Sequence, residues 1–250
     1  MSVAAAAIAA PVGALVGLGA GWLSVALERI EKLEDEDRED RDAYQREVDA
    51  AVAAASERGE PPPTADPWPH QRFGWTWLER YLAPLLGAAG FTAFAVHEAL
   101  GTGLVIHCLW LALFVQVVVF DLKHRLILNR VTYPTVVVAL ALASWSPGLT
   151  IWRSLAGAVV IGLFFLLQNI VSRGSIGLGD AKLGALVGAV CGLSLDLTHI
   201  GALYAVIYAV FLGGGVSLLL LILRIRGLKD PIPYGPFLCV GASVILFLGP

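Results

Sequence analysis

Two aspartates stand beside long apolar segments, and their type and placement suggest acid–base chemistry. Asp121 ends an apolar run that starts at Phe114, and Asp180 opens another apolar run 59 residues later. An acid inside a membrane span costs about 3 kcal/mol on insertion scales, so such a carboxylate indicates a functional site by default. Two carboxylates that lie close together tend to share one proton and to titrate as a unit. One can then accept a proton from water while the other donates to a peptide carbonyl oxygen.

The residues around Asp180 fit that chemistry. Gly177 and Gly179 are expected to permit positive φ and to leave room for an extended substrate backbone. Lys182 either tunes the acid pair electrostatically or extends its ammonium group to the membrane surface. The two acids also have a simpler interpretation as helix caps or interface anchors, since an acid such as Asp180 is favourable at a helix N-terminus.

The composition indicates what kind of scaffold carries these acids. Of the 250 residues, 57% are hydrophobic and 15% are charged, whereas about a quarter of the residues in a soluble domain are charged. Fifteen of the 20 acidic residues lie between Glu28 and Glu79, so the rest of the chain is poor in acids. We therefore predict an all-α, polytopic membrane helix bundle in the lipid bilayer, with no nucleic-acid partner.

Eight apolar segments approach the roughly 20 residues that cross a bilayer. They lie near residues 5–27, 81–99, 103–121, 132–146, 153–172, 180–195, 199–223 and 234–249. Turn residues between them, such as Gly101-Thr102-Gly103, predict antiparallel hairpins. Glycines at four-residue spacing, at positions 13, 17 and 21 and again at 184, 188 and 192, predict close helix packing.

The cations predict the orientation of the bundle, because cytoplasmic loops retain Lys and Arg. With the N-terminus outside, 16 of the 17 Lys and Arg residues lie on the cytoplasmic side and Arg153 alone lies outside. Asp121 and Asp180 then lie at the cytoplasmic ends of their helices, at similar depth. They can face each other there.

Residues 28–80 form an acidic segment with a net charge of −7, predicted to be cytoplasmic. We expect it to begin as a helical extension of the first span and to continue as a solvated linker, with the run Pro61-Pro62-Pro63 as an extended spacer. The aromatic residues that follow suit the headgroup layer; they are Trp68, Phe73, Trp75, Trp77 and Tyr81. The predicted division is 1–80, the first span plus this segment, and 81–250, the remaining membrane domain.

Three segments resemble the type IV prepilin peptidases, which are membrane aspartic peptidases with a GxGD motif. Residues 121–132 resemble the first aspartate segment of the family, with Asn129 eight residues after the Asp. Residues 177–183, Gly-Leu-Gly-Asp-Ala-Lys-Leu, resemble the second aspartate segment, including its Lys. Residues 232–237 resemble the stretch that opens the last span of these enzymes.

The resemblance implies that Asp121 and Asp180 are catalytic and that nearby residues support them, namely Gly177, Gly179, Lys182 and Asn129. It implies cleavage of the basic leader of a prepilin or pseudopilin at the cytoplasmic face of a prokaryotic inner membrane, without a cofactor. Many members also bind zinc through two C-x-x-C pairs after the first span and transfer methyl groups. Residues 28–80 contain no cysteine, so we expect no metal site there and a peptidase-only enzyme.

Two other interpretations stay open. A proton-coupled small transporter could use the same carboxylates as proton carriers, and a catalytically silent member could serve as an assembly scaffold. The position of the acids at helix ends, away from the membrane midplane, favours the peptidase. The oligomeric state and the substrate are not predicted.

Overall fold

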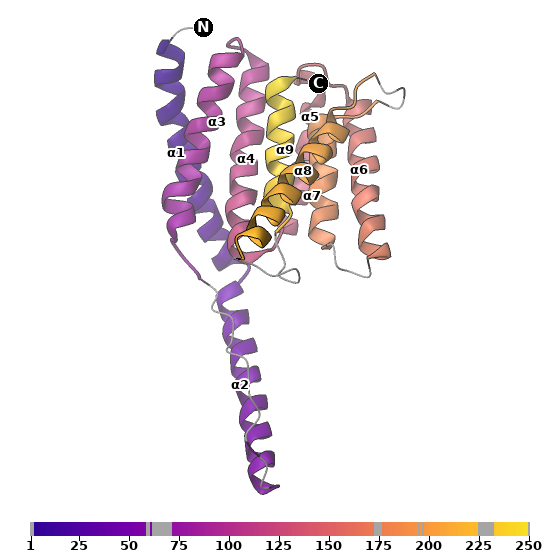
Figure 1. Ribbon diagram of the computed structural model, residues 1–250. Coiled ribbons are helices and arrows are strands. Elements are labelled where there is room, and N and C mark those ends of the chain that lie inside the picture. The colour runs from indigo at the N-terminus through magenta and orange to yellow at the C-terminus, as the bar shows by residue number, and fades with distance from the viewer. Residues whose placement is uncertain are drawn as a thin grey trace.

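The computed structural model describes residues 3–58, 61, 72–172, 177–194, 196, 198–224 and 233–249. These residues form helices joined by turns and loops, with no β-strand among them. The bundle consists of α1 (Val3–Ile30), the short π-helix η1 (Leu78–Leu82), α3 (Ala83–His97), α4 (Thr102–His124), α5 (Asn129–Leu142), the short 3-10 helix η2 (Ala143–Trp145), α6 (Ile151–Val171), α7 (Leu178–Cys191), α8 (Gly201–Ile222) and α9 (Gly235–Leu248). A further helix, α2 (Leu33–Glu57), projects from one end of the bundle (Figure 1).

The helices have the lengths and composition of a multi-pass membrane protein. Four of them, α1, α4, α6 and α8, are long and apolar enough to span a bilayer by themselves. The other four bundle helices, α3, α5, α7 and α9, have 14 or 15 residues, about 21 to 23 Å at 1.5 Å per residue. Each of the eight predicted spans coincides with one bundle helix within a few residues. The predicted all-α membrane bundle is therefore confirmed.

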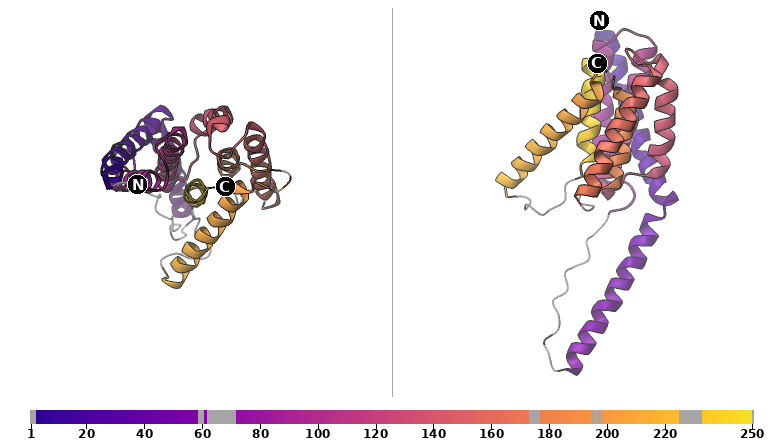
Figure 2. Two further views of the ribbon diagram at one scale, coloured as in Figure 1. Left: turned by 90° about the horizontal axis from the view of Figure 1, so that it is seen from above. Right: turned by 90° about the vertical axis from the view of Figure 1, so that its right-hand side faces the viewer.

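The acidic segment is helical at its start, as predicted, but it forms a helix separate from the first span. The first helix ends at Ile30, and α2 restarts at Leu33 after a break at Lys32, which has a left-handed backbone with φ of 54°. The predicted helical extension is therefore present as a second helix, because the left-handed conformation at Lys32 interrupts the first. Figure 2 shows α2 leaving the bundle as a separate, mostly exposed rod. Most of the predicted proline spacer, at Pro62 and Pro63, and Trp68 lie outside the described residues.

Glycines bring several helix pairs into close contact, as their spacing predicts. A Cβ added to Gly13 or Gly17 would lie within 2.3 Å of a backbone oxygen of α3, at Gly87 and Ala83 respectively. A Cβ added to Gly188 of α7 would lie 2.1 Å from a backbone oxygen of α6. Only residues without a side chain permit such approach, which gives van der Waals contact between helices in lipid.

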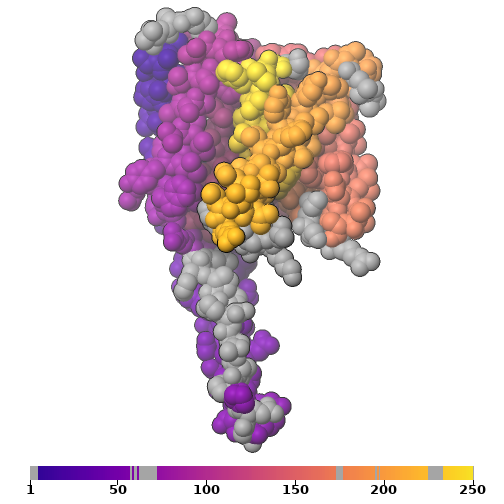
Figure 3. Space-filling model, in the orientation of Figure 1, coloured from indigo at the N-terminus to yellow at the C-terminus, as the bar shows by residue number. Residues whose placement is uncertain are grey.

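Helix α9 occupies the middle of the C-terminal half of the bundle and packs against α4, α7 and α8. Helix α8 runs diagonally across one face of the molecule (Figure 3) and continues without a break through Gly213, Gly214 and Gly215. The C-terminal end of α4 and the N-terminal ends of α7 and α9 lie at the end of the bundle from which α2 projects (Figure 1). This end therefore gathers Asp121, at the end of α4, and Asp180, at the start of α7.

Candidate active site

Asp121 lies in the last turn of α4 and is almost completely buried, with 4% of its surface exposed. The preceding residues from Phe114 to Phe120 are all buried, so this part of α4 lies inside the bundle. The helix ends because Arg125 adopts a left-handed backbone, with φ of 54°, and donates its N–H to the Asp121 carbonyl at 2.8 Å. This C-terminal cap fixes where the apolar run of α4 stops and leaves the Asp121 carboxylate inside the bundle.

The N-terminus of α9 abuts the Asp121 carboxylate. A Cβ built on Gly235 would lie 2.5 Å from Asp121 Oδ2, so any side chain there would clash with the carboxylate. The positive end of a helix dipole favours a nearby acid. The backbone N–H of Gly235 interacts favourably with this carboxylate, whereas Asp121 Oδ2 is buried without a full hydrogen bond among the described residues.

Asp180 lies in the first turn of α7, where its N–H donates to the Gly177 carbonyl at 3.1 Å. Asp180 is close enough to Asp121 for the two carboxylates to interact electrostatically, and it interacts in the same way with Tyr234. Tyr234 immediately precedes Gly235, so the start of α9 borders both acids. Unlike Asp121, Asp180 is only half-buried, and its neighbours Gly177 and Leu178 are exposed.

The two glycines before Asp180 do not adopt the positive φ that we expect from the sequence. Gly177 has φ of −67°, and Gly179 is not among the glycines with positive φ. Gly179 instead allows a close approach, since a Cβ there would lie 3.2 Å from the Ile127 side chain. That part of the prediction is wrong because Gly179 belongs to the first helical turn, where ordinary helical φ applies.

Lys182 connects the start of α7 to α5. Its Nζ donates to Asn129 Oδ1 at 2.6 Å and lies 5.6 Å from the centre of the Tyr133 ring. Among the described residues, Lys182 forms no ion pair with a carboxylate. Lys182 and Asn129, both singled out in the sequence, thus contact each other at the same end of the bundle as the two aspartates.

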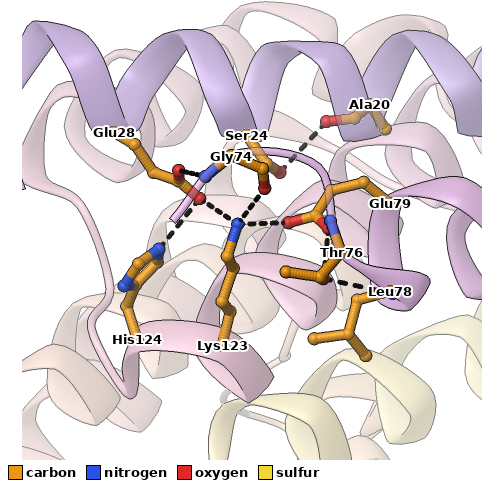
Figure 4. A network of polar contacts seen from close by, with 9 residues as sticks. All are labelled: Ala20, Ser24, Glu28, Gly74, Thr76, Leu78, Glu79, Lys123 and His124. Atoms are coloured by element: carbon orange, nitrogen blue, oxygen red, sulfur yellow. Dashed lines mark hydrogen bonds and ion pairs between the residues drawn. The ribbon is translucent and has the colours of Figure 1, made fainter. Parts of the chain in front are cut away.

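A second polar cluster lies on the other side of Asp121, and we name it the lysine cluster (Figure 4): Glu28, Glu79, Lys123 and His124. Lys123 Nζ lies 2.5 Å from Glu28 Oε1 and 2.8 Å from Glu79 Oε1, and no more than 4% of any of these three side chains is exposed. His124 Nε2 lies 2.9 Å from the same Glu28 oxygen.

The lysine cluster extends into the segment before η1. Lys123 Nζ also donates to the Gly74 carbonyl at 2.5 Å, and the Gly74 N–H donates to Glu28 Oε2 at 2.8 Å. Thr76 donates its N–H at 2.7 Å and its hydroxyl to Glu79 Oε2. The ring of Phe73 stacks on His124, whereas Trp75 and Trp77 are exposed near the start of α3. Residues 73–79 are thereby attached to both α1 and α4.

Sequence reasoning missed the lysine cluster, because it treated Glu28 and Glu79 as members of a solvated acidic segment. It also missed the contact of Gly235 with Asp121, although residues 232–237 were singled out; of these, Ile232 lies outside the described residues. Within the described part of the chain, no group of three His, Cys, Asp or Glu side chains could hold a metal ion.

Part of the chain that contains these residues is similar to a known protein family. Residues 104–218 match the profile of the type IV leader peptidase family. The matched range includes all the site residues predicted from the sequence, namely Asp121, Asn129, Gly177, Gly179, Asp180 and Lys182. Glu28, Glu79 and Gly235 lie outside it.

Two curated proteins are similar to this chain, and both are named prepilin leader peptidase/N-methyltransferase. That of Xanthomonas campestris pv. campestris is 28% identical over 134 residues, 52% of this chain and 45% of that protein. That of Dichelobacter nodosus is 26% identical over 180 residues, 68% of this chain and 58% of that protein. The chain thus spans about half the length of these relatives. No solved structure matches it.

Proposed function

We propose that this chain, whose residues 104–218 match the type IV leader peptidase family, is a membrane aspartic endopeptidase that removes the leader of type IV prepilins or pseudopilins. The names of the two similar proteins support the peptidase activity. Those names also include an N-methyltransferase; the proposal concerns the peptidase alone. The observation that carries the proposal is the convergence of Asp121 and Asp180, from two separate helices, at one end of the bundle.

The proposed reaction is hydrolysis of a peptide bond by water held between the two carboxylates. The ionised aspartate accepts a proton from the water, whose oxygen attacks the peptide carbonyl carbon. The protonated aspartate donates its proton to the carbonyl oxygen, giving a tetrahedral intermediate. Collapse of that intermediate breaks the C–N bond, returns the hydroxyl proton to one aspartate and delivers the other proton to the leaving amine. The pair thus ends with the single shared proton with which it began.

Asp121 and Asp180 differ in burial, and this difference supports a separate contact of each acid with the substrate. Asp121 is enclosed by the bundle, whereas Asp180 adjoins the exposed residues Gly177 and Leu178. A substrate backbone can therefore approach along the start of α7 and meet the enclosed carboxylate behind it. Exclusion of bulk water around Asp121 strengthens the electrostatic interactions that stabilise a developing oxyanion.

The distribution of cations supports an active site at the cytoplasmic face of the inner membrane. With the N-terminus outside, this face carries 16 of the 17 Lys and Arg residues and the ends of α4 and α7 that bear the two acids. The junction between a short polar leader and a substrate's membrane helix would lie at the same depth. The bilayer and a prepilin or pseudopilin are accordingly the proposed partners.

The test is cleavage of a co-expressed prepilin by the Asp121→Asn and Asp180→Asn variants. Each should process the prepilin roughly 100- to 10,000-fold more slowly than the unmodified protein, as expected on loss of a general acid or base. Asp196→Asn is a matched control, because Asp196 is fully exposed and lies beyond the opposite end of α7. Full processing by both variants, or proton-coupled flux in vesicles without any cleavage, would contradict the peptidase proposal.

A further inference from the structure

The lysine cluster saturates the ammonium group of Lys123. Its Nζ has three hydrogens to donate, and three acceptors surround it, from Glu28, Gly74 and Glu79. Glu28 belongs to α1, Gly74 to the loop before η1, and Glu79 to η1 (Figure 4). One side chain of α4 therefore joins three separate parts of the N-terminal region, each through a directed bond.

The place of Lys123 along α4 connects this cluster to Asp121. The two residues are two positions apart in the last helical turn, so their side chains leave α4 about 200° apart. Asp121 meets α9 at Gly235 on one side, and Lys123 meets α1 and η1 on the other. The turn that carries Asp121 is thus held from opposite sides, and His124 adds a further contact to Glu28.

Stability alone is a poor explanation for this arrangement. Burying charged groups incurs a desolvation penalty that their mutual attraction often fails to exceed, and well-packed apolar residues of similar volume are often at least as stabilising. A saturated ionic cluster differs from an apolar contact in that it fixes direction as well as distance. The lysine cluster can therefore hold the last turn of α4 in a single position better than an apolar contact could.

We propose that Lys123 is a positioning residue for Asp121, held by Glu28 and Glu79, and that the N-terminal hairpin of α1, η1 and α3 thereby sets the position of this carboxylate. The inference rests on the proposed function. It assigns a role in the reaction to residues outside the range that matches the family. The N-terminal region is on this basis a part of the active-site scaffold as well as a membrane anchor.

The experiment uses the full-length protein purified in detergent and a peptide that spans a prepilin cleavage junction. Three variants are compared: Lys123→Met, Lys123→Arg, and the triple variant Lys123→Met, Glu28→Gln, Glu79→Gln. The triple variant removes Lys123 and both carboxylates together, so it avoids the buried carboxylates that the single Lys123→Met change leaves without their cation. Glu31→Gln is the matched control, since it breaks an ion pair with Arg130 that is partly exposed.

A positioning role predicts a loss of kcat with little change in KM. A displacement of about 1 Å can lower the rate roughly 100-fold, and we expect that loss for Lys123→Met and for the folded triple variant. KM should stay within about twofold, because substrate binding in the ground state is unchanged. Lys123→Arg should recover part of the rate, and Glu31→Gln should retain all of it. A folded triple variant with unaltered kcat overturns the inference.

A second measurement separates this inference from the proposed function. Spin labels at Leu122→Cys and Leu178→Cys, both exposed positions, report the distance between the ends of α4 and α7 when Cys108 is replaced by Ala. The distribution should be narrow with Lys123 present and broad in the triple variant. An unchanged distribution overturns positioning by Lys123, whether or not the protein cleaves prepilin. Absence of cleavage by the unmodified protein, with broadening in the triple variant, would instead overturn only the peptidase proposal.

Discussion

Asp121 and Asp180 are each followed two residues later by a lysine, and the two lysines have very different surroundings. Lys123 is buried and bonded to two carboxylates and a backbone carbonyl. Lys182 is partly exposed and contacts an exposed amide oxygen and a tyrosine ring. Equal spacing in the sequence therefore corresponds to a rigid attachment on the Asp121 side and to a looser one on the Asp180 side.

This difference suggests a division of labour between the two acids. The enclosed turn of α4 contacts α9 and carries the lysine cluster, so we expect Asp121 to hold one position before substrate binds. The first turn of α7 borders the surface, so Asp180 is less enclosed than Asp121. Preorganised groups and movable groups commonly share an active site in this way.

A large effect is expected on the Asp121 side from the contact with α9. Gly235→Ala introduces a Cβ where Asp121 Oδ2 now lies, at 2.5 Å, and displaces the carboxylate. We predict a roughly 100-fold loss of prepilin cleavage, measured with purified protein of unchanged helix content. Gly214→Ala is the control, because nothing lies within 4 Å of a Cβ at that position, and it should cleave normally. Equal activities of the two variants would show that α9 does not constrain Asp121.

A smaller effect is expected on the Asp180 side. Lys182→Met removes the hydrogen bond to Asn129, a partly exposed contact worth about 1 kcal/mol or less. The free energy of unfolding should fall by that amount, against about 3 to 5 kcal/mol when Lys123→Met removes the cation between two buried carboxylates. Chemical denaturation of both variants in detergent measures the two losses side by side. Equal losses would remove the contrast between the two lysines.

The smallest effect is predicted for the projecting helix. Deletion of residues 34–58 removes nearly all of α2 but keeps Glu28, Gly74 and Glu79, which attach the N-terminal region to α4. Cleavage should therefore stay within about twofold of that by the full-length protein, in an assay with membrane-inserted protein. A large loss in a correctly inserted deletion variant would instead assign α2 a part in substrate docking or bundle stability.

The sequence predicts the helices well because hydropathy alone determines most of their bounds. The apolar segments and the glycine stripes correspond to the bundle helices and to their close contacts at Gly13, Gly17 and Gly188. The break at Lys32 was not predictable in the same way, since a non-glycine residue with positive φ leaves no compositional signal.

The sequence predicts only some of the residues of the candidate active site. The two aspartates stand out because acids are rare in apolar surroundings, but Glu28 and Glu79 do not, since they border a segment that contains many solvated acids. Their burial depends on how α1 and η1 pack against α4, which is a tertiary property. The contact of Gly235 with Asp121 likewise depends on the packing of α9. A signal was available at Lys123, a cation directly after a span and two residues from a candidate acid.

The most direct test of the central claim is whether the side chains at positions 121 and 180 come together in the membrane-inserted protein. Asp121→Cys and Asp180→Cys are combined in a background with the three native cysteines replaced by alanine, and a short thiol cross-linker is added. The account predicts efficient bridging of this pair and none between positions 121 and 151, since Ile151 begins α6 at the opposite end of the bundle. Failure to bridge positions 121 and 180, under conditions in which Glu98→Cys is bridged to His107→Cys, whose native side chains lie 2.6 Å apart, would contradict it.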